Sequence, residues 1–547
     1  MRRGWVLVGL LVACTSAGTR TIVPSRVVLV SFDGLGADEL AKHSDLPAFA
    51  KLEREGRFVE RVTPVTPCVT SSAHVAILTG TPPSVNGIVA NRFHEPGKPW
   101  TEIADGFSAD IDAETLVEAA HRQGKRVGSI AFPTIDARNV RRSADFGLVY
   151  SDPLVRSRMI HLTRADFHGS YGAVMRASLA PGADIVAYDT TDDHVTDYDK
   201  FVIDTPAGQI TPNPWFSISE KKADGLYGSW SKLLRATPTL DDVTIYWGAV
   251  SRTEGYPASF RQLADDQVGF WPGPPDERSA QDRIEGGDGI DPETFAEQNA
   301  RFCRFFADAT ALAIGQMKFD LLLVYEPTVD KAEHQFFITL DTQAHATPEN
   351  RAAGTRVRTR AFEDADRAVQ RIASTLDPAH DTLVVTGDHG LAPIDTEVHL
   401  KRLLTDWGFD RDWIAIATGG GVAHLYGSTK TAELKAKLEE TGFIERIDPK
   451  SHPNSGDLVL FAYPNIALSP FGGEPVTNPR GYGQHGGIGS HHEFQTVLIA
   501  WGAGIARATI PHMRQTEIAA YVSGLLGIKT PRALAESASA PRGSLPR

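Results

Sequence analysis

Residues 26–33 read RVVLVSFD, a continuous apolar run that ends in an aspartate. A run without polar alternation predicts a parallel strand buried on both faces. Further strand-like runs lie at 127–132, 183–188, 321–325, 382–386 and 495–501, and helical spacing lies at 46–56, 71–80, 113–124, 292–317, 350–375 and 515–526. This alternation predicts an α/β fold, a doubly wound and mostly parallel sheet with helices on both faces.

Two regions break the alternation in a chain of 547 residues, which is too long for one small core. Residues 190–290 are rich in Pro, Gly, Tyr and Trp and predict an insertion of short strands and long loops. Residues 408–465 predict a small β-α-β insertion. The predicted division is a signal peptide at 1–13, the catalytic core at 24–190, 291–407 and 466–529, the two insertions, and a disordered tail at 530–547.

The Trp-rich region 190–290 has two interpretations. In the first, the region forms a wall over an active site and selects the leaving group. In the second, its aromatic residues pack the core of a small β subdomain.

The N-terminus carries Arg2 and Arg3, followed by an apolar stretch at 5–13. This pattern predicts an export signal, too short to span a bilayer as a stable helix. The letters LVAC at 11–14 resemble a bacterial lipobox, which implies cleavage before Cys14 and lipidation of its thiol. A plain secretory signal that carries a cysteine is the alternative. We expect an exported protein, periplasmic or at the cell surface, with membrane contact only through Cys14.

The formal net charge of −13 disfavours a surface for nucleic-acid polymers, because phosphate backbones attract basic patches. A small anionic substrate is still compatible with this charge if bound metal ions supply local positive charge.

Residues 66–80, TPCVTSSAHVAILTG, hold several groups that could act as nucleophile or base. They are the Cys68 thiol, the hydroxyls of Thr70, Ser71 and Ser72, and the His74 imidazole. The stretch has the form of a loop that opens a helix, whose N-terminal amides favour an anion. Cys68 could also pair with Cys303, and the sequence leaves that question open.

Three aspartates and three histidines lie next to predicted strands. They are Asp33 after the first strand, Asp330 and His334 after 321–325, Asp388 and His389 after 382–386, and His485 in a glycine-rich loop. Open α/β sheets bind ligands beyond the carboxyl ends of their strands. Each residue alone has an ordinary interpretation as a cap or a core residue. As a set, mixed carboxylate and imidazole ligands suit zinc, and six are about right for two ions that clamp a phosphoryl group.

The ordered motifs resemble one superfamily. They are Ser-Phe-Asp33-Gly, Thr70 four residues before His74, Thr79-Gly80, Gly87-Ile-Val-Ala-Asn91, Asp330-x-x-x-His334, Gly-Asp388-His389-Gly and His485-Gly. Over residues 26–505 the chain resembles the alkaline phosphatase superfamily, and within it the nucleotide pyrophosphatase/phosphodiesterase branch.

The resemblance implies a role for each motif residue. Asp33, Asp388, His389 and Thr70 would hold one Zn²⁺, and Asp330, His334 and His485 a second, with other divalent metals also suitable. Thr70 would attack phosphorus and become a phosphothreonine that metal-activated water hydrolyses, since a threonine hydroxyl is a poor nucleophile without such activation. Asn91 would bind a non-bridging oxygen, and the Ser71 backbone amide would donate to the phosphoryl group. Tyr325 would line the leaving-group pocket or be a core residue at a strand end. His74 is interpreted as structural.

Some positions depart from the motifs of this branch or of neighbouring branches of the superfamily. Ser71 and Ala73 stand where the branch often has an aromatic residue and an asparagine, which weakens the nucleotide assignment more than the catalytic one. Residues 131–136 lack the Lys-x-Arg pair of threonine-type phosphomonoesterases, although Arg138, Arg141 or Arg142 could supply a cation from nearby. This favours a diester or pyrophosphate monoanion as the substrate.

We therefore expect a metal-dependent hydrolase of small phosphodiesters or pyrophosphates. Phosphomonoesterases and phosphonate hydrolases of the same superfamily are alternatives, and a non-catalytic substrate-binding lipoprotein is an alternative of another class. Cys68 lacks the C-x-P/A-x-R context of sulfatases, and the chain has no G-x-S-x-G elbow of serine hydrolases.

Overall fold

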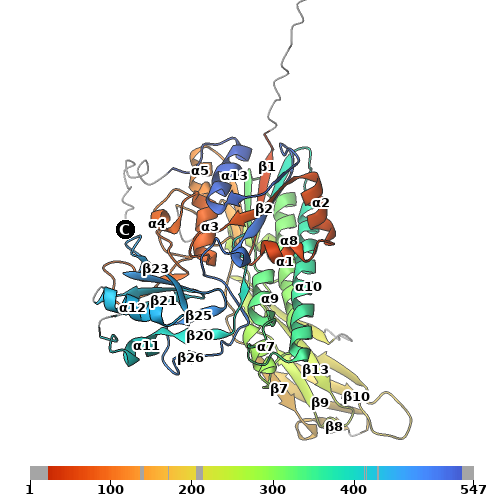
Figure 1. Cartoon of the computed structure of the whole chain (residues 1–547). Helices are drawn as coiled ribbons and strands as arrows, with labels where there is room; N and C mark the ends of the chain where they lie inside the picture. The colour runs from red at the N-terminus through yellow and green to blue at the C-terminus, as the bar shows by residue number, and fades with distance from the viewer. Residues whose placement is uncertain are drawn as a thin grey trace, which may run out of the picture.

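The computed structural model describes residues 23–532 except 136–140, 171, 181, 205–213, 412, 414 and 428–429. The expected signal peptide, Cys14, Arg138 and most of the expected tail lie outside the described residues. At the centre of the described chain is a ten-stranded sheet (Figure 1). Its strands are, in order, β16 (Glu254–Tyr256), β6 (Phe146–Val149), β5 (Val127–Ile130), β17 (Leu321–Glu326), β1 (Arg26–Phe32), β18 (Asp381–Gly387), β28 (Thr496–Gly502), β2 (Arg57–Thr63) and β29 (Ala508–Ile510), with β30 (Met513–Arg514) also paired to β2.

The middle of this sheet is parallel. Strand β1 lies between β17 and β18, and Val30 is level with Val324 on one side and Val385 on the other. The parallel run continues through β5 to β6, whereas β28 and β16 are antiparallel to their neighbours. The predicted doubly wound, mostly parallel sheet is confirmed.

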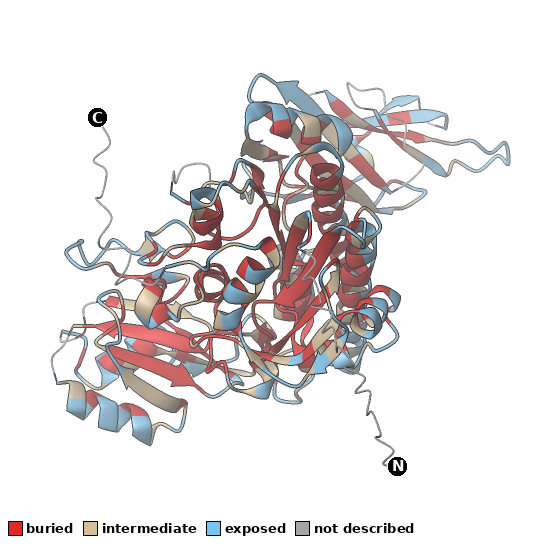
Figure 2. Ribbon diagram, turned by 90° about the horizontal axis from the view of Figure 1, so that it is seen from above, coloured by how far each residue is buried: buried red, intermediate tan, exposed pale blue. Residues whose placement is uncertain are grey.

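Alternate side chains of β1 enter two different cores. Val28, Val30 and Phe32 pack with α2 (Pro47–Glu55), α8 (Pro292–Gln316) and α10 (Pro348–Ala373). Val27 and Leu29 pack on the opposite face with α3 (Thr70–Thr79), α5 (Leu116–Arg122) and α13 (Ile518–Leu526). Figure 2 shows the central strands buried and the outer faces of the covering helices exposed. A strand buried on both faces explains why the RVVLVSF run lacks alternation.

Helix α3 starts at Thr70 and ends where Gly80 adopts a left-handed backbone, with φ of 71°. All ten of its residues are buried. The apolar ones, including Ile77 and Leu78, fix it against the sheet, so that its first turn is held at the carboxyl edge of β1.

The first inserted unit consists of two antiparallel sheets. One contains β8 (His168–Ser170), β9 (Val174–Ala180), β10 (Ala183–Tyr188) and β11 (Lys200–Asp204), and the other β7 (Arg158–Leu162), β14 (Val243–Trp247), β13 (Gly225–Ala236), β12 (Trp215–Lys222) and β15 (Ser251–Arg252). The strand expected at 183–188 therefore does not join the central sheet, because β9 and β11 occupy both of its edges. The unit begins with β7, upstream of the expected start at 190, while the division into domains stays a prediction.

The tryptophans of this region take part in packing. The Arg301 guanidinium of α8 lies between the rings of Trp215 and Trp230, 4.3 and 4.2 Å from their centroids. Trp271 is buried against three phenylalanines of α8. These contacts support the packing interpretation of the Trp-rich region and attach the unit to the catalytic core.

The second inserted unit is a four-stranded sheet with the order β21 (Ala415–Gly419), β22 (Val422–Tyr426), β24 (Leu458–Ala462) and β23 (Ile444–Pro449), together with α12 (Thr431–Glu440). The expected order of strand, helix and strand is present, with β23 added after the helix, and all neighbouring strands are antiparallel, so the unit contains no parallel crossover. The two units lie apart, at the lower left and lower right of Figure 1. Among the described residues, no helix combines the length and the apolar character needed to span a membrane.

Candidate active site

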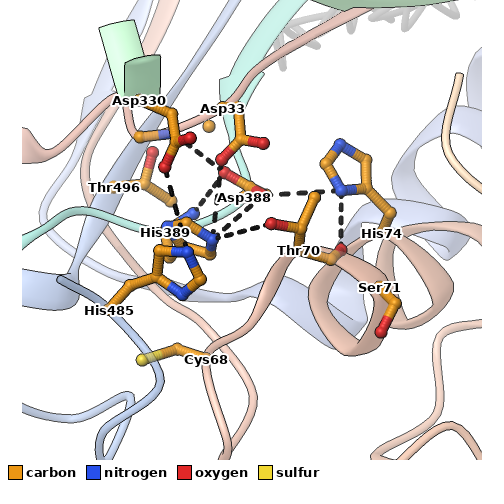
Figure 3. Close-up of polar contacts among 12 residues, drawn as sticks. Asp33, Cys68, Thr70, Ser71, His74, Asp330, Asp388, His389, His485 and Thr496 are labelled. Carbon is orange, nitrogen blue, oxygen red and sulfur yellow. Dashed lines mark hydrogen bonds and ion pairs between the residues drawn. The ribbon is translucent and has the colours of Figure 1, made fainter. Parts of the chain in front are cut away.

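The predicted ligands meet at the carboxyl edge of the central sheet. Asp33 follows β1, Asp388 and His389 follow β18, and α9 (Thr328–Phe336), which follows β17, carries Asp330 and His334. Thr70 begins α3, and His485 follows the short strand β27 (Gly483–Gln484). Figure 3 shows the side chains of Asp33, Asp330, Asp388, His389, His485 and Thr70 directed toward one another.

The side chains form two adjoining groups that could each hold a metal ion. One is Asp33, Asp388 and His389, and the other is Asp330, His389 and His485; within each group the ligand atoms lie within 4.8 Å of one another. The His389 Nε2 atom is 3.3 Å from Asp388 Oδ2 and 3.6 Å from Asp33 Oδ1. His389 thus lies between the two groups, which the sequence did not indicate.

Thr70 and His334 complete the two groups. The Thr70 hydroxyl oxygen lies 3.5 Å from His389 Nε2. The His334 Nε2 atom is 3.1 Å from Asp330 Oδ1, and its ring centroid is 5.1 Å from that of His485. All seven residues predicted as metal ligands are therefore brought together.

The chemistry of this donor set fits divalent metal ions. Asp33 Oδ1 and Asp388 Oδ2 are buried and accept no hydrogen bond within the described part of the chain, and the buried Asp330 Oδ1 faces the ring nitrogens of His334 and His485. Burying carboxylates this close together is costly unless a cation compensates their charge. Carboxylate oxygens with imidazole nitrogens are ligands that zinc prefers.

The electrostatics of the metal-free cluster show the same need for a cation. Burial and the neighbouring Asp330 raise the pKa of Asp33 to about 7, although Tyr325 and Lys331 act in the opposite direction. Burial, Asp33 and Asp330 raise the pKa of Asp388 well above its usual value. The cluster therefore does not keep all its carboxylates ionised at neutral pH without a bound cation.

The histidines of the cluster differ in charge. Burial lowers the pKa of His389 to about 4 and that of His485 well below its usual value, so both are neutral and able to bind a metal. Burial also acts to lower the pKa of His334, but the Asp330 carboxylate outweighs it and raises that pKa to about 9. In the metal-free protein, a protonated His334 thus forms an ion pair with Asp330.

Several hydrogen bonds engage those atoms of the predicted metal ligands that do not face the cluster. The Tyr325 hydroxyl donates a hydrogen bond to Asp33 Oδ2, which leaves Oδ1 free. The Gly34 and His389 amides donate to Asp388 Oδ1 at 3.1 and 2.8 Å. The His334 Nδ1 atom lies 2.8 Å from the Gly483 carbonyl, which leaves Nε2 facing Asp330. Such outer contacts fix the orientation of metal ligands.

Gly34 has a further reason to be glycine. Its φ is +75°, and a Cβ atom there would lie 2.8 Å from the Asp330 Cα atom. Only glycine lets the loop after β1 approach α9 this closely, and this approach brings Asp33 next to Asp330.

Asn91 is oriented by the helix that carries Thr70. The Ser71 amide donates to Asn91 Oδ1 at 2.9 Å, so the amino group of Asn91 is not engaged in that bond. The Ser71 amide was predicted to donate to the phosphoryl group, whereas in this structure it is used by Asn91. The Ser71 side chain points away from the cluster (Figure 3).

Cys68 and Cys303 are both buried and free. The Cys68 thiol donates to the Gly487 carbonyl at 3.3 Å, and burial raises its pKa to about 12. A thiol of this kind is protonated at neutral pH and is a poor nucleophile. Cys68 therefore packs beneath the His485 loop and does not form a disulfide with Cys303.

A cavity of about 540 Å³ opens beside Thr70 and the metal ligands. Aromatic residues Phe107, Phe132, Tyr150 and Tyr325 line one part of it, so Tyr325 lines this cavity as well as holding Asp33. Lys331 is the one lysine among the described lining residues, and no arginine is among them. The sequence predicted a cation on the loop after Phe132 and not this lysine, although the position of Lys331 between Asp330 and His334 would have indicated it.

Two of the three arginines considered near that loop lie in the described part of the chain, and both are engaged by other groups of the protein. The Arg142 guanidinium donates to the carbonyls of Thr134 and Ala109, at 2.6 and 2.8 Å, and Arg141 pairs with Glu118 at 3.0 Å. Arg142 thereby braces the loop that contains Thr134, whose φ of 70° is unusual for a β-branched residue.

The fold and the ligands clustered around Thr70 define an α/β protein with candidate metal-binding groups at the carboxyl edge of its sheet. The sequence model of the type I phosphodiesterase/nucleotide pyrophosphatase family matches residues 27–460, and the chain belongs to this family.

Individual relatives are distant. A bis(5'-adenosyl)-triphosphatase of Xenopus laevis is 29% identical over 142 residues, which is 25% of this chain and 31% of that protein. The murine ectonucleotide pyrophosphatase/phosphodiesterase 5 aligns over 92% of this chain and 96% of its own, with a TM-score of 0.50 and 13% identity. Its inactive threonine-to-alanine variant, solved in complex with AMP, gives a TM-score of 0.51. At this level of identity, the structural likeness supports the fold alone.

Proposed function

We propose that the chain hydrolyses phosphodiester or pyrophosphate bonds of small molecules, through a phosphothreonine intermediate at a two-zinc site. The observation that supports this most is the place of Thr70 Oγ1, at the start of a buried helix and 3.5 Å from the His389 Nε2 atom that lies between two ligand groups. Asp33, Asp388, His389 and Thr70 would hold one ion, and Asp330, His334 and His485 the other.

The chain's own groups position the substrate. Bound zinc would lower the pKa of the Thr70 hydroxyl and compensate the charge on the phosphoryl oxygens. The free amino group of Asn91 donates to a non-bridging oxygen, and the first turn of α3 adds its positive dipole end. The Thr70 oxygen forms a bond to phosphorus as the leaving-group oxygen departs on the opposite side, and water then cleaves the phosphothreonine to release the phosphoryl product.

Steady-state kinetics test this proposal. We expect kcat/KM for an aryl phosphodiester or a nucleotide aryl ester to exceed that for an aryl phosphomonoester, because the described pocket lacks a pair of cations for a dianion. Thr70→Ala should lower kcat by about a thousand-fold or more while two zinc ions remain bound per chain. Full activity of this variant, or of metal-free protein, would contradict the proposal.

A phosphomonoesterase or phosphonate hydrolase is the second candidate, because the Lys331 ammonium lines the pocket and could compensate one extra negative charge. A monoester preference in the same kinetics would favour it. A chain that binds fewer than two zinc ions and hydrolyses none of these esters would support the non-catalytic alternative.

Export and anchoring rest on the sequence alone. We propose cleavage before Cys14 and lipidation of its thiol. Cys14→Ser should release the protein from the membrane fraction, and mass spectrometry of the wild-type N-terminus should show a lipid-modified cysteine.

A further inference from the structure

Lys331 places a positive charge inside the candidate active-site pocket. It lies next to the predicted metal ligands but is not one of them. It follows Asp330 directly on α9, and its side chain is 22% exposed. Since Asp330 and His334 are four residues apart and share one face of α9, Lys331 points about 100° away around the helix. Its Nζ atom lies 3.1 Å from Glu277 Oε1, at the start of α7 (Glu277–Ile284).

The pocket continues past this ion pair. Asp152 lines both the pocket and an adjoining cavity of about 870 Å³, and Glu277 also lines the adjoining cavity. The Lys331–Glu277 pair therefore lies where the two spaces meet. A substrate bound at the cluster has a path for its far end along Lys331.

Most carboxylates of the adjoining cavity are already engaged. Asp276 accepts hydrogen bonds from Tyr246 and the Ser279 amide, Asp282 pairs with Arg480, and Asp288 pairs with His161. Arg156 and Arg278 also line this cavity, and neither has an ion pair within the described part of the chain. Two guanidinium groups without an ion pair therefore lie beyond Lys331, together with the carboxylates of Asp152, at the junction, and Asp276, whose hydrogen-bond partners are uncharged.

We propose that Lys331 binds a second anionic group of the substrate, the phosphate next to the scissile phosphorus in a pyrophosphate bond, with Arg156 and Arg278 facing the groups beyond it. This inference rests on the proposed function and selects pyrophosphate-linked substrates from the wider class of phosphodiesters. Lys331 is then a specificity-determining residue, and Glu277 holds its ammonium in place until the substrate phosphate takes over the contact.

The first test compares two substrates in Lys331→Met. A dinucleoside diphosphate presents two anionic phosphates, whereas the nitrophenyl ester of a nucleoside monophosphate presents one. We expect kcat/KM for the dinucleotide to fall by about 10- to 100-fold, the range for losing one charge-assisted hydrogen bond, and kcat/KM for the nitrophenyl ester to fall by less than about 3-fold. Lys331→Arg should retain most of the dinucleotide activity. Equal losses on both substrates would overturn the inference.

Glu277→Gln is the matched control, because it breaks the same ion pair from the other side. Our proposal expects it to raise kcat/KM for the dinucleotide, since the ammonium no longer has to leave Glu277 to bind phosphate. If the pair only holds α7 against α9, Glu277→Gln and Lys331→Met should have the same effect, and the inference fails.

Binding measurements separate this inference from the proposed function. Calorimetry on zinc-loaded protein should show that ADP binds more tightly than AMP, and that Lys331→Met removes this difference. The measurement remains decisive even if none of the esters is hydrolysed. If Lys331→Met instead lowers kcat/KM only for the nitrophenyl ester, Lys331 contacts the scissile phosphoryl group, and the inference is contradicted.

Discussion

The His74 Nδ1 atom lies 2.8 Å from the carbonyl oxygen of Thr70, one turn earlier in α3. The same nitrogen is 3.5 Å from Asp388 Oδ2. His74 thus connects the residue proposed as nucleophile to a proposed metal ligand, and its burial lowers its pKa to about 3. We therefore expect a neutral His74 imidazole to position Thr70 and not to act as the general base.

Substitution of His74 should therefore affect geometry and not the pH profile. Asparagine can present a donor near the position of Nδ1, whereas alanine leaves the Thr70 carbonyl without this partner. We expect kcat to fall by about 10-fold or more in His74→Ala and less in His74→Asn, the range for one hydrogen bond to a charged network. Loss of an acidic limb from the kcat profile would show instead that His74 is a base.

Tyr325→Phe should weaken metal binding. The variant keeps the ring in the pocket but removes the hydroxyl that donates to Asp33. Outer contacts of this kind are worth about 10- to 100-fold in metal affinity. Zinc competition with a chelating dye measures the effect, and saturating zinc should restore most of the activity. An unchanged zinc affinity would show that Tyr325 acts only on the substrate.

The metal-free protein should lose stability between pH 7 and pH 9. The folded-state pKa of His334, about 9, lies above its ordinary value of 6.5, whereas that of Asp33, about 7 against 3.8, adds a loss that is largely complete by pH 7. Groups with a raised pKa bind more protons when folded, so the free energy of unfolding falls as the pH rises toward the folded pKa. The lowered pKa of His389 has the opposite effect, but only below pH 6.5.

We expect His334 alone to contribute a loss of about 2 kcal/mol over this range, at about 1.4 kcal/mol per pKa unit. Urea unfolding at several pH values measures it. The zinc-loaded protein should show a much flatter dependence, because its ligands are already deprotonated. A metal-free protein that is more stable at pH 9 than at pH 7 would contradict the assignment of the cluster.

Cys68→Ala should leave the chemistry intact. The thiol is buried against the Gly487 carbonyl and is protonated, so we expect kcat/KM within about 3-fold of the wild type and insensitivity to thiol reagents. A small loss of stability, of about 1 kcal/mol, follows from the lost packing. A much larger loss of activity would reopen the possibility of a thiol nucleophile.

Local patterns predicted the elements that have a strong periodicity. The run 26–33, the long helices at 292–317 and 350–375, and the helix beginning near Thr70 appear where they were expected, because a buried strand and an amphipathic helix each leave a repeat in the sequence. The run 183–188 was assigned to the wrong sheet, because its pattern does not state which strand it pairs with.

The sequence by itself determined the α/β fold, the family and the set of seven candidate ligands, because these follow from local periodicity and from the order of short motifs. Tertiary structure alone decided that His389 lies between the two ligand groups, that Tyr325 holds Asp33, and that the Ser71 amide is used by Asn91. It also brought Lys331 to Glu277, 54 positions earlier in the chain. Such contacts depend on how strands far apart in sequence align at one edge of the sheet, and no local pattern records that alignment.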